Sequence, residues 1–189
     1  MQENLGIRRD KKEIGPYYTN VEYQSQYLDI GDKMDALTAC GITCLYITIK
    51  TFKTNNELPG LEEMVTEAKQ DPTGYVSGVG WAHQYFVDVA KKYGLDAYRK
   101  DPFSIKKIKE ELDNGKLIIS SCNRKFLGRT VSTHMIVVTG YSPDGLYYVD
   151  PASITKQQQK DHYLASYKDF EKDYNNRSII IGLPKENKK

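Results

Sequence analysis

The order of hydrophobic patterns along the chain constrains its fold more than any other feature. Segments whose apolar residues recur with a helical period come first, and short β-rich runs come after them. This order favours an α+β domain over a parallel βαβ array, in which helices and strands would alternate. We therefore expect N-terminal helices packed on a C-terminal antiparallel sheet.

Four helices are predicted in the first part of the chain. Residues 1–37 show no regular pattern, and a helix then covers Cys40–Phe52, with Thr38 as its possible cap. Shorter helices are expected over 61–69, over 81–93 and from Ser104 to Asn114. Their ends are marked by proline, glycine or a capping serine.

The second part of the chain is expected to form the sheet. Strands are predicted over 117–122, 133–141, 146–150 and 177–183, with a short helix around Phe170 that Ser166 and Asp169 open. The turn signal Ser142–Gly145 joins two of these strands into a hairpin.

Composition excludes several classes of protein. The chain has 189 residues, with 27 basic and 25 acidic side chains and a formal net charge of +2, and the Lys-rich residues 185–189 account for that excess. Such a balance argues against a nucleic-acid binder, and no apolar run approaches the roughly 18 residues of a membrane helix. We expect a flexible leader over 1–19, one domain over 20–184 and a short tail. Without a hydrophobic signal core, the chain is either cytosolic or a secreted form whose signal peptide has been removed.

Cys40 is the first candidate for chemistry. It begins the strongest predicted helix, where unpaired backbone N–H groups and the helix dipole lower the pKa of a thiol. Gly41 is expected to leave room beside the sulfur for a substrate carbonyl. The alternative is a small buried residue at the start of a core helix. Since the chain has three cysteines, at least one thiol is unpaired in a monomer.

His134 and Asp150 are candidate partners of this thiol. They lie on successive strands of the predicted hairpin, and a three-residue turn would place both side chains on one face. In that register about 13 Å of strand still separates them. Contact therefore requires a wider turn or a bulge, for which Gly140 is the candidate.

Other polar residues allow less specific interpretations. Cys40 and Cys44, one helical turn apart, could hold a metal together with Cys122 or His134, but Cys44 and Cys122 are better explained as core residues. His83 and His162 are assigned surface or packing roles. The acidic residues of 29–35 fit a solvated loop better than a calcium site, and tyrosines could line a peptide groove or pack between strands.

Five blocks of the sequence resemble the papain-like peptidases related to bacteriocin double-glycine leader peptidases. The blocks span residues 20–151 and are Val21–Gln26, Ala39–Gly41, Gly80–His83, His134–Tyr141 and Val149–Pro151. The resemblance implies a papain-like fold and a Cys-His-Asp set. It makes Cys40 the nucleophile, His134 the base and then acid, and Asp150 the orienting carboxylate.

The same resemblance implies an oxyanion hole formed by the Cys40 backbone N–H and the Gln26 side chain, with Gln24 as the rival donor. The interval from Gln26 to Cys40 is similar to that of free-standing relatives, so we expect a form without an attached transporter. We expect a cysteine peptidase or amidase that needs no cofactor or metal and acts on a peptide or protein. A ligase that uses the same thioester and a non-catalytic peptide-binding module are the alternatives.

Overall fold

The computed structural model describes residues 7–8, 17–18, 21–53, 58–123, 133–155 and 162–185. Its helices are α1 (Lys33–Thr38), α2 (Cys40–Phe52), α3 (Leu61–Gln70), α4 (His83–Lys92), α5 (Ile105–Asp113) and α6 (Tyr167–Asp173). The strands are β1 (Ile7–Arg8), β2 (Tyr17–Tyr18), β3 (Tyr75–Val76), β4 (Gly80–Trp81), β5 (Asp96–Lys100), β6 (Leu117–Asn123), β7 (Thr133–Ser142), β8 (Gly145–Val149), β9 (Tyr163–Ser166) and β10 (Tyr174–Gly182).

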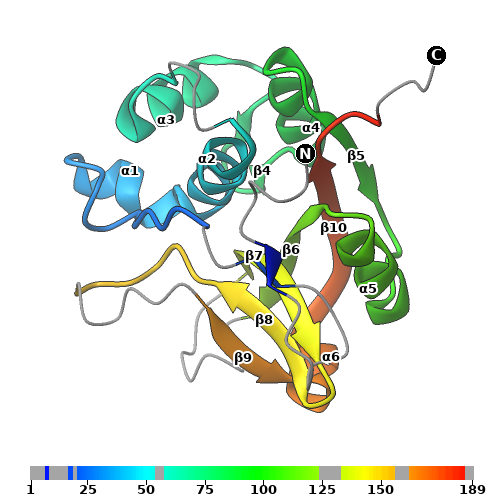
Figure 1. The fold of residues 1–189 in the computed structure, drawn as a ribbon. Helices are drawn as coiled ribbons and strands as arrows, with labels where there is room; N and C mark the ends of the chain where they lie inside the picture. The colour runs from blue at the N-terminus through cyan, green and yellow to red at the C-terminus, as the bar shows by residue number, and fades with distance from the viewer. Residues whose placement is uncertain are drawn as a thin grey trace.

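A single antiparallel sheet organises the described chain. Its path is β1-β2-β7-β6-β10-β5, and β8 and β9 extend from β7, while β3 and β4 form a separate hairpin. Helices α1 to α4 gather at the top of Figure 1, and β8, β9 and α6 lie at the bottom. The predicted α+β architecture is confirmed. The expected leader and tail fall mostly outside the described residues.

Helix α2 is the central helix of the molecule, and its predicted bounds are confirmed. Eleven of its 13 residues are buried, because it packs against α3, α4 and the sheet at once. The predicted cap is wrong. Thr38 ends α1, where its hydroxyl donates to the Asp35 carbonyl at 3.2 Å, and Ala39 joins the two helices without a side-chain cap.

Three further predictions need correction. Residues 33–37 were expected to be irregular but belong to α1, because the Asp32 carboxylate caps this turn by accepting from the Asp35 N–H at 2.8 Å. Trp81 was expected on a helix but lies in β4, and α4 begins two residues later. Strands β5 and β9 were not predicted, because neither carries a continuous apolar run.

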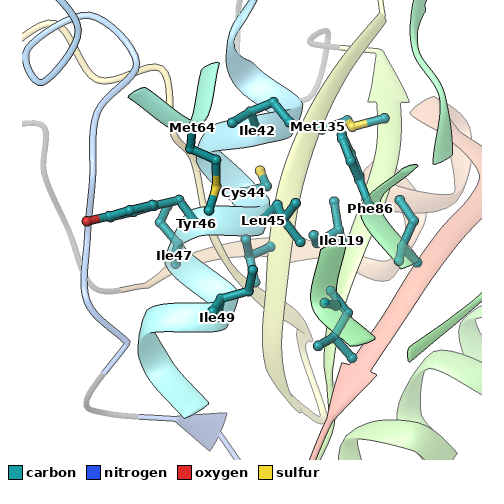
Figure 2. Packing of buried hydrophobic residues seen from close by; sticks show 14 of the residues in the cluster. Ile42, Cys44, Leu45, Tyr46, Ile47, Ile49, Met64, Phe86, Ile119 and Met135 are labelled. Carbon is teal, nitrogen blue, oxygen red and sulfur yellow. The ribbon is translucent and has the colours of Figure 1, made fainter. Parts of the chain in front are cut away.

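Two hydrophobic clusters cover the two faces of the sheet. One joins α2, α3 and α4 to residues such as Ile119 and Ile179, and the other joins α5 and α6 to Ile118 and Ile180. Figure 2 shows the first cluster, with side chains of α2 packed against Phe86, Ile119 and Met135. Alternate residues of the same strands thus serve opposite cores.

The β7–β8 hairpin differs from the predicted three-residue turn. Ser142 pairs with Gly145, so two residues form the loop, and the register shifts between Val138 and Gly140. The bulge expected at Gly140 is confirmed at this place. Val149 pairs with Val137, which brings Asp150 closer to His134 along the strand than the predicted register did.

Among the residues described, no helix has both the length and the apolar character needed to cross a membrane.

Candidate active site

A cleft of about 640 Å³ lies where the start of α2 meets one end of the sheet. Strands β7, β6, β10 and β5 each contribute residues to it, and the β3–β4 hairpin forms a further wall. The lining residues are Leu37, Thr38, Cys40, Tyr75, Gly78, Val79, Gly80, Trp81, His83, Arg99, Lys100, Asp101, Ser121, Thr133, His134, Met135 and Arg177.

Cys40 is a half-buried free thiol at the first position of α2. Burial acts to raise its pKa, but the hydrogen bond to the His134 side chain and the charge of that ring act in the opposite direction. Backbone hydrogen bonds with Met135 and Gly41 also lower the pKa of Cys40, and the net effect of all these causes is a lowered pKa. The Cys40 thiol therefore loses its proton more readily than an ordinary cysteine.

His134 lies between the thiol and a carboxylate. Its Nε2 is 2.7 Å from Asp150 Oδ1, and its side chain is also hydrogen-bonded to Cys40. Burial acts to lower the pKa of His134, but the hydrogen bonds to Asp150 and Cys40 and the charges of both raise it overall. This arrangement favours a thiolate beside an imidazolium.

The Asp150 carboxylate is held in place by the turn that follows it. Its Oδ1 also accepts from the Ala152 N–H at 2.9 Å, and the Asp150 carbonyl accepts from the Tyr23 hydroxyl at 2.9 Å. Burial is the main reason that the pKa of Tyr23 rises to about 12, so this hydroxyl stays a donor at neutral pH. Asp150 is thus fixed on the side of His134 away from the cysteine.

Gln26 is joined to this turn through its backbone. Its N–H donates to the Pro151 carbonyl at 2.8 Å, and its side chain is 2% exposed, with Nε2 donating to the Ala36 carbonyl at 2.7 Å. Gln24 is half-buried. Neither glutamine is among the described residues that line the cleft.

Gly41 has a packing role that the sequence does not predict. A Cβ atom at this position would lie 2.7 Å from Phe86 Cζ, 2.9 Å from Met135 Sδ and 3.0 Å from Trp81 Cδ1. Neighbouring side chains therefore fill the place that a side chain at this position would take. Glycine instead allows the first turn of α2 to pack closely on the sheet and on β4.

The comparisons with known proteins decide which family this geometry belongs to. The profile of the Peptidase_C39 like family matches residues 18–179. The chain belongs to this family. No curated protein matches it.

Solved structures of C39-like proteins share the fold at low sequence identity. A C39-like protein from Bacillus anthracis superposes with a TM-score of 0.67 and 15% identity, over 94% of this chain and 100% of that one. A double-glycine-motif protease from an AMS/PCAT transporter, solved with its leader peptide, gives 0.56 and 19%, over 87% and 97%. The peptidase domain of Streptococcus ComA, a bifunctional ABC transporter, gives 0.51 and 15%, over 78% and 93%.

The remaining candidates from the sequence have structural roles in this C39-like fold. Cys44 and Cys122 are fully buried in the two cores. Asp29 accepts from the Ser25 N–H, and Asp35 pairs with Lys69. Within the described ranges, no three His, Cys, Asp or Glu side chains gather closely enough to hold a metal ion.

Sequence reasoning missed one end of the cleft. His83, assigned a surface or packing role, is half-buried in the cleft wall, while His162 lies outside the cleft against Thr139. Arg99, Lys100 and Arg177 also line the cleft, although they are far apart in the sequence. No local motif marks these three residues, because only the pairing of β5 with β10 brings them together.

Proposed function

We propose that the protein is a cysteine peptidase that hydrolyses a peptide bond with Cys40, His134 and Asp150. The observation that carries the proposal is the His134 ring, hydrogen-bonded to the Cys40 thiol on one side and to the Asp150 carboxylate on the other. Cys40 and His134 line the cleft, and Asp150 is buried against His134. A thiolate, a base and an orienting carboxylate in this order are the arrangement that acyl transfer requires.

In the acylation step, the Cys40 thiolate attacks the carbonyl carbon of the substrate. The tetrahedral intermediate collapses as the C–N bond breaks, and the His134 imidazolium gives its proton to the leaving amine. The acyl group then remains on the sulfur as a thioester. In the second step, neutral His134 removes a proton from water, and the hydroxide attacks the thioester carbonyl. The C–S bond then breaks, the acyl group leaves as a carboxylic acid that loses its proton to water, and the thiolate and the imidazolium are restored.

The oxyanion needs donors that are already in position. We assign this role to the Cys40 backbone N–H, in the first turn of α2, together with the Gln26 side chain. The amide nitrogen of Gln26 has two hydrogens, of which Ala36 accepts one. Its backbone hydrogen bond to Pro151 ties Gln26 to the Asp150 turn, and this connection favours Gln26 over Gln24.

A peptide is the substrate class that the cleft suits. Its open shape and mixed polar and apolar lining, which includes exposed Val79 and Leu37, can take an extended chain. The transporter protease of the same fold was solved with a leader peptide bound, which supports the assignment.

The experiment is a comparison of Cys40→Ala with Cys44→Ala. Peptides generated from a whole-cell digest are incubated with each protein, and new termini are identified by mass spectrometry. We expect Cys40→Ala to lose all cleavage while its circular dichroism spectrum is unchanged. Cys44→Ala, one turn further along the same helix, should keep cleavage because its thiol is sealed in the core.

Alkylation by iodoacetamide provides a second measurement that needs no substrate. Cys40 should react well below pH 8, and His134→Ala should slow that reaction, because the hydrogen bond and charge that favour the thiolate are lost. Cleavage by Cys40→Ala, or a Cys40 that titrates like an ordinary thiol, would contradict the proposal and favour a non-catalytic peptide-binding module.

A further inference from the structure

The register of the sheet places a row of residues across the floor of the cleft. Met135 on β7 pairs with Ser121 on β6, and Ser121 pairs with Arg177 on β10. Neighbouring strands are about 4.8 Å apart, so Arg177 lies two strand spacings, about 10 Å, from the strand that carries His134. Arg99 and Lys100 follow on β5, one strand further from β7.

A bulge in β10 sets the position of Arg177. Tyr174 pairs with Cys122 and Arg177 with Ser121, so two extra residues on β10 lie between adjacent residues of β6. One of them, Asn176, has a left-handed backbone with φ of 55°, and its carbonyl accepts from the Phe103 N–H at 2.8 Å. Bulges beside functional sites re-aim side chains, and this one directs Arg177 to the cleft.

This end of the cleft has an excess of positive charge. We call Arg99, Lys100 and Arg177 the basic end. Asp101 is the sole carboxylate among the described lining residues, and its Oδ2 lies 3.1 Å from Arg177 Nε. Arg99 Nε donates to the neutral Gln84 side chain at 3.2 Å. Among the described lining residues, three cations therefore face one carboxylate, which is an excess of two positive charges.

The field of this end reaches into the cleft, as its effect on His83 shows. Burial is the main cause that lowers the pKa of His83, and the charges of Arg177 and Arg99 lower it further. Asp101 opposes these effects without reversing them. A negatively charged group in the cleft would therefore be attracted to the basic end.

We propose that the basic end binds a carboxylate of the peptide substrate, about three or four residues from the scissile bond. The spacing follows from the 10 to 14 Å between β7 and the two arginine-bearing strands and the rise of about 3.3 Å per residue in an extended peptide. Arginine pairs with carboxylates through two parallel hydrogen bonds. This inference rests on the proposed peptidase function, and the carboxylate can be an Asp or Glu side chain or the C-terminus of the substrate.

The test uses a library of randomised decapeptides with both ends blocked, in which one position at a time is fixed as Glu or as Gln. We expect kcat/KM to be about tenfold higher for Glu than for Gln at one position on one side of the scissile bond, and the ratio to fall in 0.5 M salt. A parallel library with a free C-terminus distinguishes the two sources. If the enzyme prefers peptides with a free C-terminus and shows no preference for Glu over Gln, the basic end binds the C-terminal carboxylate of the substrate.

A series of charge variants ties the preference to these residues. Asp101→Asn removes one negative charge and should increase the Glu/Gln ratio. Arg177→Gln should decrease the ratio, and the double variant Arg99→Gln/Arg177→Gln should bring it close to one. The matched control is Lys168→Gln, an exposed lysine on α6 outside the cleft, which should leave the ratio unchanged. Structural damage alone would not increase the ratio in Asp101→Asn.

Binding separates failure of this inference from failure of the proposed function. Fluorescence anisotropy with the labelled Glu and Gln peptides measures affinity for Cys40→Ala, in which no turnover is required. Tighter binding of the Glu peptides without cleavage by the wild type would keep the carboxylate site and reject the peptidase. The inference would be overturned if the Glu and Gln peptides bind equally or not at all, and if the wild type also cleaves them equally or not at all.

Discussion

At the scale of single residues, the proposed mechanism depends on a proton shared between Cys40 and His134. Each group shifts the pKa of the other toward the ion pair, and Asp150 adds the charge that keeps the imidazolium protonated. Activity should therefore rise with pH as the pair loses the proton of Cys40 and fall as it loses the proton of His134. The two limbs define a window in which the ion pair exists.

Asp150→Asn should narrow the pH range of activity by lowering its alkaline limit. The asparagine can still accept a hydrogen bond, but it lacks the charge that raises the pKa of His134, so the imidazolium loses its proton at lower pH. We expect the alkaline limb of kcat/KM to move to lower pH and the maximum to fall by about 100-fold. The measurement is a pH profile between 4 and 10 with one peptide substrate.

The control for this variant is Asp88→Asn. It removes a carboxylate of α4 that hydrogen-bonds Gln84 and does not line the cleft, so both limbs should stay in place. An alkaline limb that does not move in Asp150→Asn would assign it to a group other than His134.

The three proposed catalytic residues could be identified in the sequence, but the contact between His134 and Asp150 could be predicted only in part. Cys40, His134 and Asp150 lie in local patterns that a single sequence displays, and parity placed the last two on one face. The contact itself depends on a two-residue loop and a bulge between Val138 and Gly140, and only the bulge was anticipated. The basic end was missed because its residues meet through pairing of β5 with β10.

At the scale of elements, α2 is buried so completely that even its threonines lie in the core. The hydroxyls of Thr48 and Thr51 donate to the carbonyls four residues earlier, at 2.8 and 2.7 Å. The buried hydroxyl of Thr43 has no hydrogen-bond partner within the described part of the chain. An unsatisfied buried hydroxyl costs stability, whereas a satisfied one contributes to it.

Thr43→Val and Thr48→Val should therefore change stability in opposite directions. Both replacements put a methyl group in place of a hydroxyl on the same helix. We expect the free energy of unfolding to rise by about 1 kcal/mol for Thr43→Val and to fall by about 1 kcal/mol for Thr48→Val. Urea unfolding at pH 7 measures both, and a shift of the same sign in the two variants would contradict the argument.

Helix α2 also shows why element boundaries were predictable where the core dictates them. Its apolar residues fixed both ends, but the cap at Thr38 was wrong because α1 leads directly into α2. Strand β5 was missed because charged residues occupy its exposed end. Local hydrophobic patterns predict which segments are buried. They do not predict which polar segment pairs with the sheet as its edge strand.

At the scale of the whole molecule, the site requires both layers to be in place. Cys40 comes from the helical layer, whereas His134 comes from the sheet that the two cores share. Ile179 and Ile180 are adjacent on β10 and fully buried, the first in the core with α2 and the second in the core with α5 and α6. Because one strand joins both cores, we expect them to unfold as one unit.

Ile179→Val and Ile180→Val test this coupling from opposite faces of one strand. Each should lower the free energy of unfolding by about 1 kcal/mol, since each removes one buried methylene group. The single tryptophan, Trp81, lies in the cleft wall on the side of the first core, so its fluorescence reports on the site, while far-UV circular dichroism reports on all elements. In urea, the two signals should coincide for the wild type and move together in both variants. If Ile180→Val shifts the dichroism transition and leaves the Trp81 transition in place, the two faces unfold separately, and the cleft can persist on a sheet whose other core is lost.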